Sequence, residues 1–411
     1  MNFITQYKGL RRENYILFIG RIVTNLGSMI WPVQTLILNQ KLGLSAAMVS
    51  IVMIFMGAIM LPAGMIGGKL ADRFEKKKII IICDTISVFF FVMCAFIPLS
   101  MISVVLISIG AACQNMEYPA YDALIADITY TKDRQKAYSL QYLGANIGLV
   151  ASPTIAGILF KNYLWLSFLL SGLAIATSTV LIFFFIKNTT PVEETDDRAV
   201  YQESKEGASL ISILKENKII FLYIIIMGIY WAAYNQYGYL MPLDMGRVHG
   251  ENGAVLYGSV SSVNCIVVVL FTPIITKLFA KLVNTKKNLL GQILLLIGYV
   301  VFLIFLGNIP VYYVAMVLFT FGEILTTIAN GPYITERIPA SHRGRINGFM
   351  GLIQSILQGI CMYLIGVFYD MKGNVFAWSF IFGLLGVAIL GSLVLIVWDK
   401  KRYKELYVKK D

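Results

Sequence analysis

Five charged side chains lie within long apolar runs of the sequence, where a charge is costly and usually serves a function. They are Arg21, Asp84, Glu117, Asp122 and Glu323. A carboxyl group removed from water favours its neutral form, so it can bind and release a proton. Glu323 lies about 20 Å from either end of its run at the helical rise of 1.5 Å per residue. We predict that Glu323 carries protons, with Glu117 and Asp122 as further candidates.

Each of these charged residues also has an alternative interpretation that involves no proton transfer. Glu323 could hydrogen-bond a neighbouring helix, and Glu117 could bind a cationic substrate or bond nearby backbone. For Arg21, Asp84 and Asp122 we favour an ion-pair cluster, in which Arg21 and Asp84 form a structural pair.

Other chemistries find little support in the sequence. Both histidines, His249 and His342, lie in loops, so no set of nucleophile, histidine and acid can be assembled. The five cysteines lie in apolar runs without a Cys-x-x-Cys pair, which argues against disulfides and metal sites. Gly68 and Lys69 are followed by Leu70, so the phosphate-binding loop of ATPases is missing. We therefore expect neither an enzyme nor a cofactor.

The composition indicates the element type that positions these groups. Of the 411 residues, 58% are hydrophobic and 14% are charged, with a mean hydropathy of +0.73. Soluble domains are roughly half apolar and about a quarter charged, so a soluble protein is excluded. The apolar runs are continuous rather than alternating, which predicts membrane-spanning helices and excludes a β-barrel. The twelve runs lie at 15–40, 46–70, 78–98, 101–127, 137–160, 163–187, 218–243, 254–280, 288–306, 310–335, 345–369 and 374–398.

The positive charges predict the orientation of these spans. Segments on the side of the N-terminus hold 29 of the 34 Lys and Arg residues, and the opposite side holds four. The positive-inside rule then places both termini in the cytoplasm of a cell (cytoplasmic) membrane. The net charge of +11 is therefore a topology signal and gives no reason to expect nucleic acid.

A polar linker divides the spans into six and six, and a faint repeat supports the division. The basic loops near Lys69 and Lys277 are offset by 208 residues, and Gly110 is matched by Gly322 with a larger offset. We predict two six-helix halves in a parallel repeat. The predicted parts are an N-terminal half (1–187), a linker (188–217), a C-terminal half (218–398) and a tail (399–411).

The loop at 67–78 has the most specific sequence, Gly-Gly-Lys-Leu-Ala-Asp-Arg-Phe-Glu-Lys-Lys-Lys. It resembles the signature loop of the major facilitator superfamily, with Glu75 in place of the usual second glycine. An acid and basic residues at helix ends can form a latch that breaks in another conformation. The alternative is a simple positive-inside anchor. For gating we predict Gly68, Asp72, Arg73, Lys77, Asp127 and Arg134.

Two further segments extend the resemblance toward the twelve-helix drug:proton antiporters. Residues 118–127 look like the end of the fourth span in this superfamily. Small residues between Gly144 and Gly157 occupy the place of a fifth-span antiporter motif, although they are equally suited to ordinary helix packing. Gln141 stands where some of these antiporters carry an acid.

The resemblance implies an all-α major facilitator fold in which spans one, four, seven and ten line a central cavity. It implies proton-coupled export of lipophilic or cationic compounds by alternating access. The alternatives are transport of an endogenous metabolite, sugar or lipid-linked precursor, and a non-transporting scaffold or sensor. The expected partners are a small molecule, protons and lipid, with the chain a monomer. For substrate binding we predict Glu117, Asn25, Gln34, Trp231, Tyr234, Asn235 and Tyr237.

Overall fold

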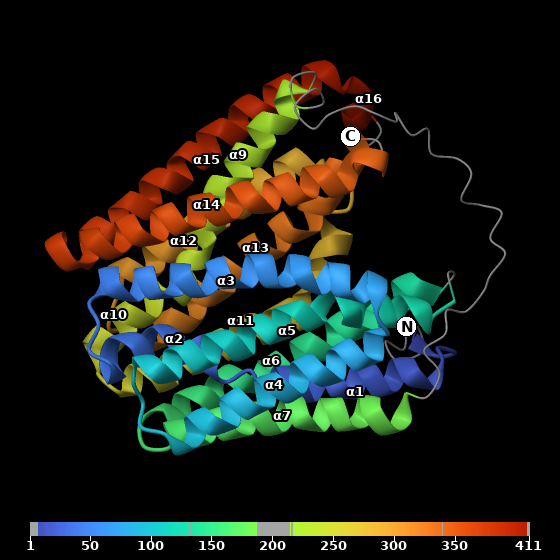
Figure 1. Cartoon of the computed structure of the whole chain (residues 1–411). Helices are drawn as coiled ribbons and strands as arrows, with labels where there is room; N and C mark the ends of the chain where they lie inside the picture. Colours follow the sequence, from blue (N-terminus) through green and yellow to red (C-terminus); the bar gives the residue numbers. More distant parts are fainter. Residues whose placement is uncertain (1–6, 131–132, 187–213, 215–216, 339, 409–411) are drawn as a thin grey trace. The chain divides into compact units, whose positions relative to one another are not determined.

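The protein is an all-helical membrane protein in the part of the chain that the structure describes, with no strand there. This computed structural model describes residues 7–130, 133–186, 214, 217–338 and 340–408. Twelve helical stretches in it are long and apolar enough to cross a membrane (Figure 1). The predicted fold class and the number of spans are thereby confirmed.

The spans of the first half of the sequence comprise eight helical segments. They are α1 (Arg12–Leu26), α2 (Ile30–Leu36), the π-helix η2 (Ile37–Lys41), α3 (Ala46–Arg73), α4 (Lys76–Phe96), α5 (Met101–Asp127), α6 (Arg134–Phe160) and α7 (Leu164–Phe185).

The second half contributes nine segments. They are α9 (Lys218–Tyr234), the 3₁₀-helix η4 (Asn235–Gly238), α10 (Leu240–His249), α11 (Asn252–Leu278), α12 (Asn284–Ile304), α13 (Ile309–Arg337), α14 (Ala340–Lys372), α15 (Asn374–Arg402) and the short α16 (Lys404–Val408).

Local sequence signals set several helix boundaries. Ser100 and Ser103 form a capping box that starts α5 at the predicted residue, Met101. Gly373 has a φ of +80°, which ends α14 and lets α15 begin one residue later. Most differences from the predicted spans are one to five residues at a helix end. At most of these ends the helix continues past the apolar run into polar residues, as at the start of α14, whereas α4, α7, α11 and α12 end two residues before the predicted span does.

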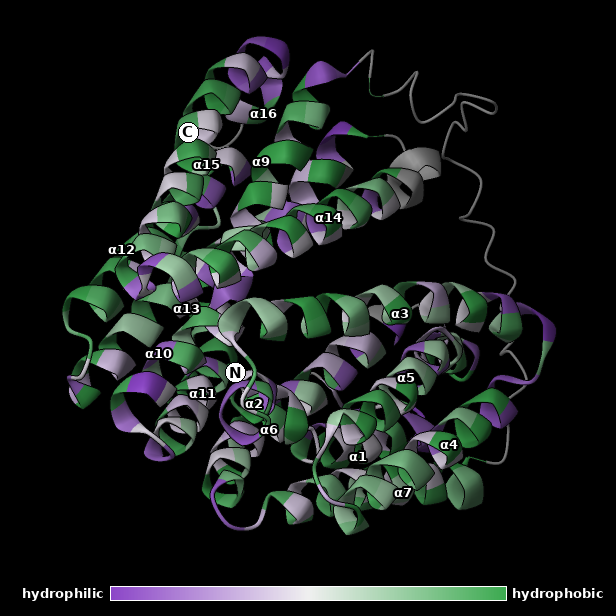
Figure 2. Cartoon of the chain, turned by 60° about the vertical axis from the view of Figure 1, so that its left-hand side comes forward, coloured by the Kyte–Doolittle hydropathy of each residue, from purple (hydrophilic) through white to green (hydrophobic). Residues whose placement is uncertain are grey.

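Hydrophobic residues follow the helices and hydrophilic residues gather at loops and helix ends (Figure 2). The spans differ in how much of their apolar surface the protein itself covers. Of the most apolar window, 61% is buried in the span Lys218–His249 and 22% in Ala46–Arg73. The seventh span is therefore mainly surrounded by protein, whereas most of the second span is not covered by protein.

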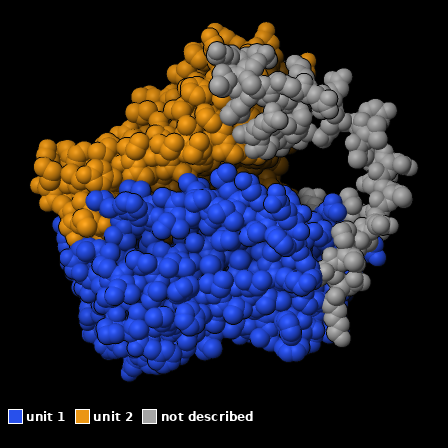
Figure 3. Space-filling model, in the orientation of Figure 1, with its two compact units in different colours: residues 1–44, 51–195, 245–265 blue, residues 45–50, 196–244, 266–411 orange. Residues whose placement is uncertain are grey.

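The chain forms two compact units (Figure 3). Unit 1 comprises 1–44, 51–195 and 245–265, and unit 2 comprises 45–50, 196–244 and 266–411. The predicted linker, 188–217, lies outside the described residues except for 214 and 217.

Each unit contains one span that is interrupted near its middle. In unit 1 the first span stops being helical at Gly27–Met29, between α1 and α2. In unit 2 the seventh span passes through η4 between α9 and α10. Gly27 and Asn235 are 208 residues apart, the same offset that relates the basic loops at Lys69 and Lys277. Interrupted spans at matching positions of a repeat are the usual place of transporter binding sites.

Candidate proton and substrate sites

Two carboxyl groups meet inside the membrane-spanning helices of unit 1. Asp84 of α4 and Glu117 of α5 lie within hydrogen-bonding distance of each other. The hydroxyl of Thr179 on α7 donates to Asp84 Oδ2 at 2.6 Å, and Asp84 is only 4% exposed. Two carboxylates this close repel each other strongly, so the pair is suited to holding one proton between them.

Helix packing fixes the depth of this carboxyl pair. Ser87, one turn after Asp84 on α4, donates to the Gly110 carbonyl of α5 at 2.8 Å. The ring of Phe91 lies against Gly110, where an added Cβ would be 3.2 Å from the ring, so a larger residue would require the ring to shift. The two helices therefore stay in register where Asp84 faces Glu117.

Arg21 of α1 is the positive charge near this pair. Its Nη2 donates to the Tyr118 hydroxyl at 2.7 Å, and its guanidinium lies 4.9 Å from the Tyr118 ring centre and 5.2 Å from that of Tyr121. It interacts electrostatically with Glu117 and with Asp122. Among the described residues no ion pair joins Arg21 to a carboxylate. In place of the structural pair predicted for Arg21 and Asp84, Arg21 donates to Tyr118 and Asp84 accepts from Thr179.

A cavity of about 310 Å³ opens beside the interruption of the first span. Gln114, which lines it, is the central residue of α5, and Trp31 enters it from the first turn of α2. None of its lining residues is charged. The lining residues are Trp31, Met60, Ala111, Gln114, Asn115 and Tyr118.

In unit 2 the predicted proton carrier Glu323 lies among aromatic side chains. The Tyr234 hydroxyl hydrogen-bonds Glu323. The rings of Tyr234 and Tyr237 lie 5.0 and 5.2 Å from that of Phe319. The Tyr299 hydroxyl lies 2.8 Å from the Tyr234 carbonyl oxygen, at the point where η4 interrupts the helical hydrogen bonds. Aromatic side chains thus fill the space beside this interruption.

The predicted substrate-binding residues fall into two groups. Trp231, Tyr234 and Tyr237 come together with Phe319 beside Glu323, and their role in substrate binding stays a prediction. The three predicted amides are bonded to protein. Their partners are the Arg21 carbonyl for Asn25, Met56 Sδ for Gln34, and the Trp231 carbonyl and Gln358 for Asn235.

The cavity residues Gln114, Asn115 and Met60 were missed by the sequence analysis, which concentrated on charged residues. A signal was available. Gln114 and Asn115 are adjacent uncharged polar residues in the middle of an apolar span.

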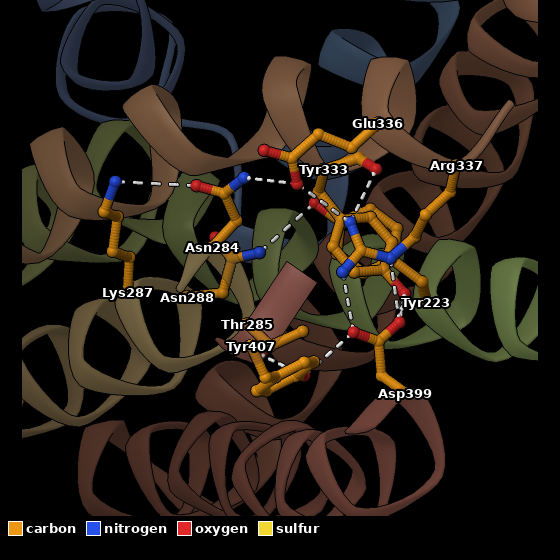
Figure 4. Close-up of polar contacts among 10 residues, drawn as sticks. All are labelled: Tyr223, Asn284, Thr285, Lys287, Asn288, Tyr333, Glu336, Arg337, Asp399 and Tyr407. Carbon is orange, nitrogen blue, oxygen red and sulfur yellow. Dashed lines mark hydrogen bonds and ion pairs between the residues drawn. The ribbon is translucent and has the colours of Figure 1, made fainter. Parts of the chain in front are cut away.

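A buried ion pair in unit 2 was also missed. Arg337 at the end of α13 donates to Asp399 of α15 through Nε at 2.8 Å and Nη2 at 2.6 Å (Figure 4). Both side chains are fully buried. Burial by itself lowers the pKa of Arg337, but the hydrogen bonds to Asp399 and the nearby negative charges of Asp399 and Glu336 together outweigh that effect, and the pKa lies above its ordinary value. The sequence analysis assigned Arg337 to a basic loop and gave Asp399 no role.

Tyrosines complete the coordination of Asp399. Tyr333 and Tyr407 donate to it at 3.1 and 2.8 Å, and Tyr407 comes from the short α16 near the end of the chain. The Arg337 guanidinium lies 3.9 Å from the Tyr333 ring centre. The Tyr223 ring stacks on the Tyr333 ring, with the two ring centres 3.8 Å apart. Figure 4 shows these contacts converging on one carboxylate. The cluster joins α9, α13, α15 and α16 and leaves Asp399 no free face.

Comparison with known proteins identifies the family. A model of the Major Facilitator Superfamily matches residues 16–361. The chain belongs to this superfamily. It is therefore a multi-pass membrane transporter, and its spans are those of the two-half major facilitator fold.

Individual relatives of this transporter are distant. It is 24% identical to a Na(+), Li(+), K(+)/H(+) antiporter of Planococcus maritimus, covering 91% of this chain and 97% of that one. It is 23% identical to Multidrug resistance protein 2 of Bacillus subtilis, covering 82% of each. Among solved structures it is similar to the peptide transporter POT in complex with sulfate, with a TM-score of 0.75, 15% identity and coverage of 96% and 95%. At this identity the structural likeness shows the fold alone.

The family's signature loop has contacts that differ from the predicted latch. Asp127 pairs with Lys76 at 3.1 Å, and Lys77 donates to the carbonyl oxygens of Phe183 and Ile186 at the end of α7. Asp72 and Arg73 are exposed and form no ion pair within the described residues. Arg134 is exposed as well. The gating role of these residues stays a prediction.

The close helix contact in this region is made at Gly67 rather than at Gly68. A side chain on Gly67 would collide with the Met116 backbone of α5, whereas a Cβ on Gly68 would meet nothing within 4 Å. The neighbouring glycine is therefore the one that packing requires.

The small residues of α6 serve helix packing in this transporter. A side chain on Gly148 would collide with the Ile22 backbone of α1, and one on Gly157 with the Ala254 backbone of α11. Gln141 is buried and donates to the Asn14 carbonyl at 3.0 Å. At the position where some antiporters carry an acid, this chain uses an amide to join α6 to α1.

Proposed function

We propose that this transporter exports lipophilic or cationic organic compounds in exchange for protons. It resides in the cell membrane with both termini in the cytoplasm. The observation that carries the proposal is the hydrogen-bonded pair of Asp84 and Glu117 on membrane-spanning helices. A shared proton within the membrane gives the protein a group that can be loaded from one side and emptied to the other.

In the proposed cycle Arg21 controls the charge of the carboxyl pair. With Arg21 bonded to Tyr118, as here, the pair keeps its proton. When α1 moves so that Arg21 reaches Glu117, the positive charge favours the ionised carboxylates and the proton leaves. Alternating access of the halves 1–187 and 218–398 exposes the pair to each side in turn. Glu323 stays the alternative carrier, and the signature loop closes the cytoplasmic side.

A second candidate function is exchange of alkali cations for protons. The relative from Planococcus maritimus favours this function, because its similarity to this chain extends over nearly the whole length of both proteins. The same carboxyl pair would serve both activities, because an ionised pair can accept a monovalent cation in place of the proton. The two functions differ in their substrate, which the test therefore varies.

The test uses purified full-length protein in liposomes that contain a pH-sensitive dye and carry an imposed proton gradient. Lipophilic compounds, Na⁺, K⁺ and Li⁺ are added separately to wild type, Glu117→Gln and Glu323→Gln. We expect a lipophilic compound to trigger proton flux in wild type and in Glu323→Gln, and the flux to be lost in Glu117→Gln.

The other outcomes separate the alternatives. Flux lost only in Glu323→Gln returns the proton to that residue. Flux triggered by Na⁺, K⁺ or Li⁺ alone selects alkali-cation exchange. If no added substrate moves protons in wild type, the antiport proposal is wrong and an endogenous metabolite becomes the leading alternative.

A further inference from the structure

The cavity in unit 1 is lined by polar groups with unused hydrogen-bonding capacity. Among the described residues, the carboxamides of Gln114 and Asn115 have no hydrogen-bond partner, and neither has the indole N–H of Trp31. All three side chains are partly buried near the middle of their spans. An unpaired polar group at this depth costs free energy unless a ligand or water pairs with it. The cavity therefore offers hydrogen-bonding groups to a polar ligand.

Tyr118 adds a further donor at the edge of the cavity. Its hydroxyl oxygen accepts a hydrogen bond from Arg21, which leaves its own O–H to donate. A hydroxyl that accepts from a guanidinium is polarised and becomes a better donor. In total, the indole, the hydroxyl and two amide NH₂ groups offer more donors than the two amide oxygens offer acceptors.

The charges around the cavity disfavour a cation. None of the lining residues is acidic, and the nearest carboxyls, Asp84 and Glu117, are bonded to each other. The face of the Tyr118 ring that could attract a cation already carries Arg21, whose guanidinium lies 4.9 Å from the ring centre. A cationic ligand would approach this arginine, and the carboxyl groups that interact with Arg21, those of Glu117 and Asp122, do not line the cavity.

The apolar part of the lining suggests the shape of the ligand. Trp31 offers a flat ring, and Met60 and Ala111 offer adaptable or small apolar surface. A volume of about 310 Å³ is at the lower end of the range found for small-molecule sites. These features suit a flat ring system of a few fused rings.

We propose that this cavity binds uncharged, flat aromatic compounds that carry carbonyl acceptors. The carbonyl oxygens accept from Tyr118, Gln114 and Asn115, and the ring lies against Trp31. The inference deepens the proposed transport function, because it names the substrate class of the same protein and favours its lipophilic members over its cationic ones.

The test compares two tricyclic probes of nearly the same shape. Acridone is neutral and carries a ring carbonyl, whereas 9-aminoacridine is protonated at neutral pH. Binding of each to the purified full-length transporter is measured by equilibrium dialysis in the absence of a proton gradient. We expect acridone to bind at least about tenfold more tightly than 9-aminoacridine.

Three variants connect the binding to the cavity. Gln114→Leu should weaken acridone binding about tenfold or more, and Tyr118→Phe, which removes one oxygen atom, should weaken it several-fold. Asn146→Leu is the matched control, because it removes a carboxamide of α6 whose one hydrogen bond within the described residues goes to the Tyr142 carbonyl of its own helix. It should leave acridone binding unchanged. Size-exclusion profiles identify any variant that fails to fold.

Three results would overturn the proposal. They are an absence of acridone binding to wild type, acridone binding that neither cavity variant changes, and 9-aminoacridine binding that is as tight as that of acridone and depends on Gln114. Because dialysis needs no gradient, acridone binding without substrate-dependent proton flux would refute antiport and leave the cavity assignment intact.

Discussion

Arg21 in unit 1 and Arg337 in unit 2 have similar surroundings and different partners. Both guanidinium groups lie over tyrosine rings, at 4.9 Å from Tyr118 and 3.9 Å from Tyr333. Arg337 reaches a carboxylate directly, with two hydrogen bonds to Asp399. Arg21 reaches the Tyr118 hydroxyl instead, and the nearby carboxyl groups bond to each other.

This difference distinguishes an ion pair that stabilises the fold from a carboxyl pair that could bind a proton. A carboxylate held by a bidentate arginine is fixed in its ionised form and ties helices together. In unit 1 the arginine is bonded to Tyr118, the residue after Glu117, so the carboxyl pair can keep a proton. The same arginine remains available to displace that proton. The same residue types therefore form a buried ion pair in unit 2 and, in unit 1, a carboxyl pair that we propose exchanges a proton.

The largest expected effect contrasts two matched substitutions. Asp399→Asn removes the buried carboxylate that pairs with Arg337 and leaves only the partly exposed Glu336, 3.1 Å from Nη1, as its ionic partner. It should cost about 3 kcal/mol of unfolding free energy. Asp84→Asn keeps an acceptor for Thr179 and a donor for Glu117, so it should cost about 1 kcal/mol or less. Unfolding of the purified variants in rising SDS measures both. Equal losses would remove the distinction between the two clusters.

The second prediction concerns rescue in unit 2. Replacing both partners, as Arg337→Met with Asp399→Leu, removes the buried charges and should recover about 2–4 kcal/mol relative to Asp399→Asn. The same SDS titration measures it, with Arg337→Met alone as the control that leaves Asp399 unpaired. If the double variant is no more stable than the single ones, direct pairing is not what stabilises this junction.

A smaller effect is expected at the end of the chain. Tyr407→Phe removes the hydroxyl that lies 2.8 Å from Asp399 and 2.9 Å from Thr285, and should cost about 1.5–3 kcal/mol. The matched control is Tyr363→Phe on α14, whose hydroxyl has no hydrogen bond within the described residues and which is 43% exposed. Thermal unfolding in detergent should separate them. Identical midpoints would show that α16 adds nothing to the cluster.

The smallest effect is expected for a third, exposed charge cluster in unit 1. Glu251 lies 3.2 Å from Lys41 and 3.6 Å from Lys161, and the hydrogen bond from Lys41 lowers its pKa. The contribution of Glu251 to the free energy of unfolding is therefore fully present above the ordinary glutamate pKa of about 4.3. It is lost as the pH falls through the lower pKa that Glu251 has in the folded protein. Glu251→Gln should shift the thermal midpoint less than Tyr407→Phe at pH 7 and low salt. The shift should vanish at high salt, and a larger, salt-independent shift would mean that burial matters there.

Sequence patterns were sufficient to predict the spans, because each bilayer crossing must satisfy its backbone internally over a fixed length. The starts of α5 at Met101 and of α15 at Asn374 agree to the residue. The interruptions at Gly27–Met29 and Asn235–Gly238 could not be read from hydropathy, because apolar residues continue on both sides of them.

The charged residues of the candidate site were identified, but their partners were not. Asp84 and Glu117 come from helices whose relative rotation depends on packing at Gly110, which a list of residues does not contain. Arg337 looked like one of many basic loop residues until α15 placed Asp399 against it. Charge identity is local in the sequence, whereas charge pairing is a property of the tertiary fold.

The Arg337–Asp399 pair also sets an order for biosynthesis. Asp399 follows Arg337 by 62 residues, and Tyr407 follows eight residues later. At about 5–20 residues per second, ribosomes add Asp399 roughly 3–12 s after Arg337. During that interval Arg337 has to remain hydrated at the membrane surface. Helices α15 and α16 therefore close this part of the protein, and a nascent chain that stops before Asp399 lacks the buried carboxylate that pairs with Arg337.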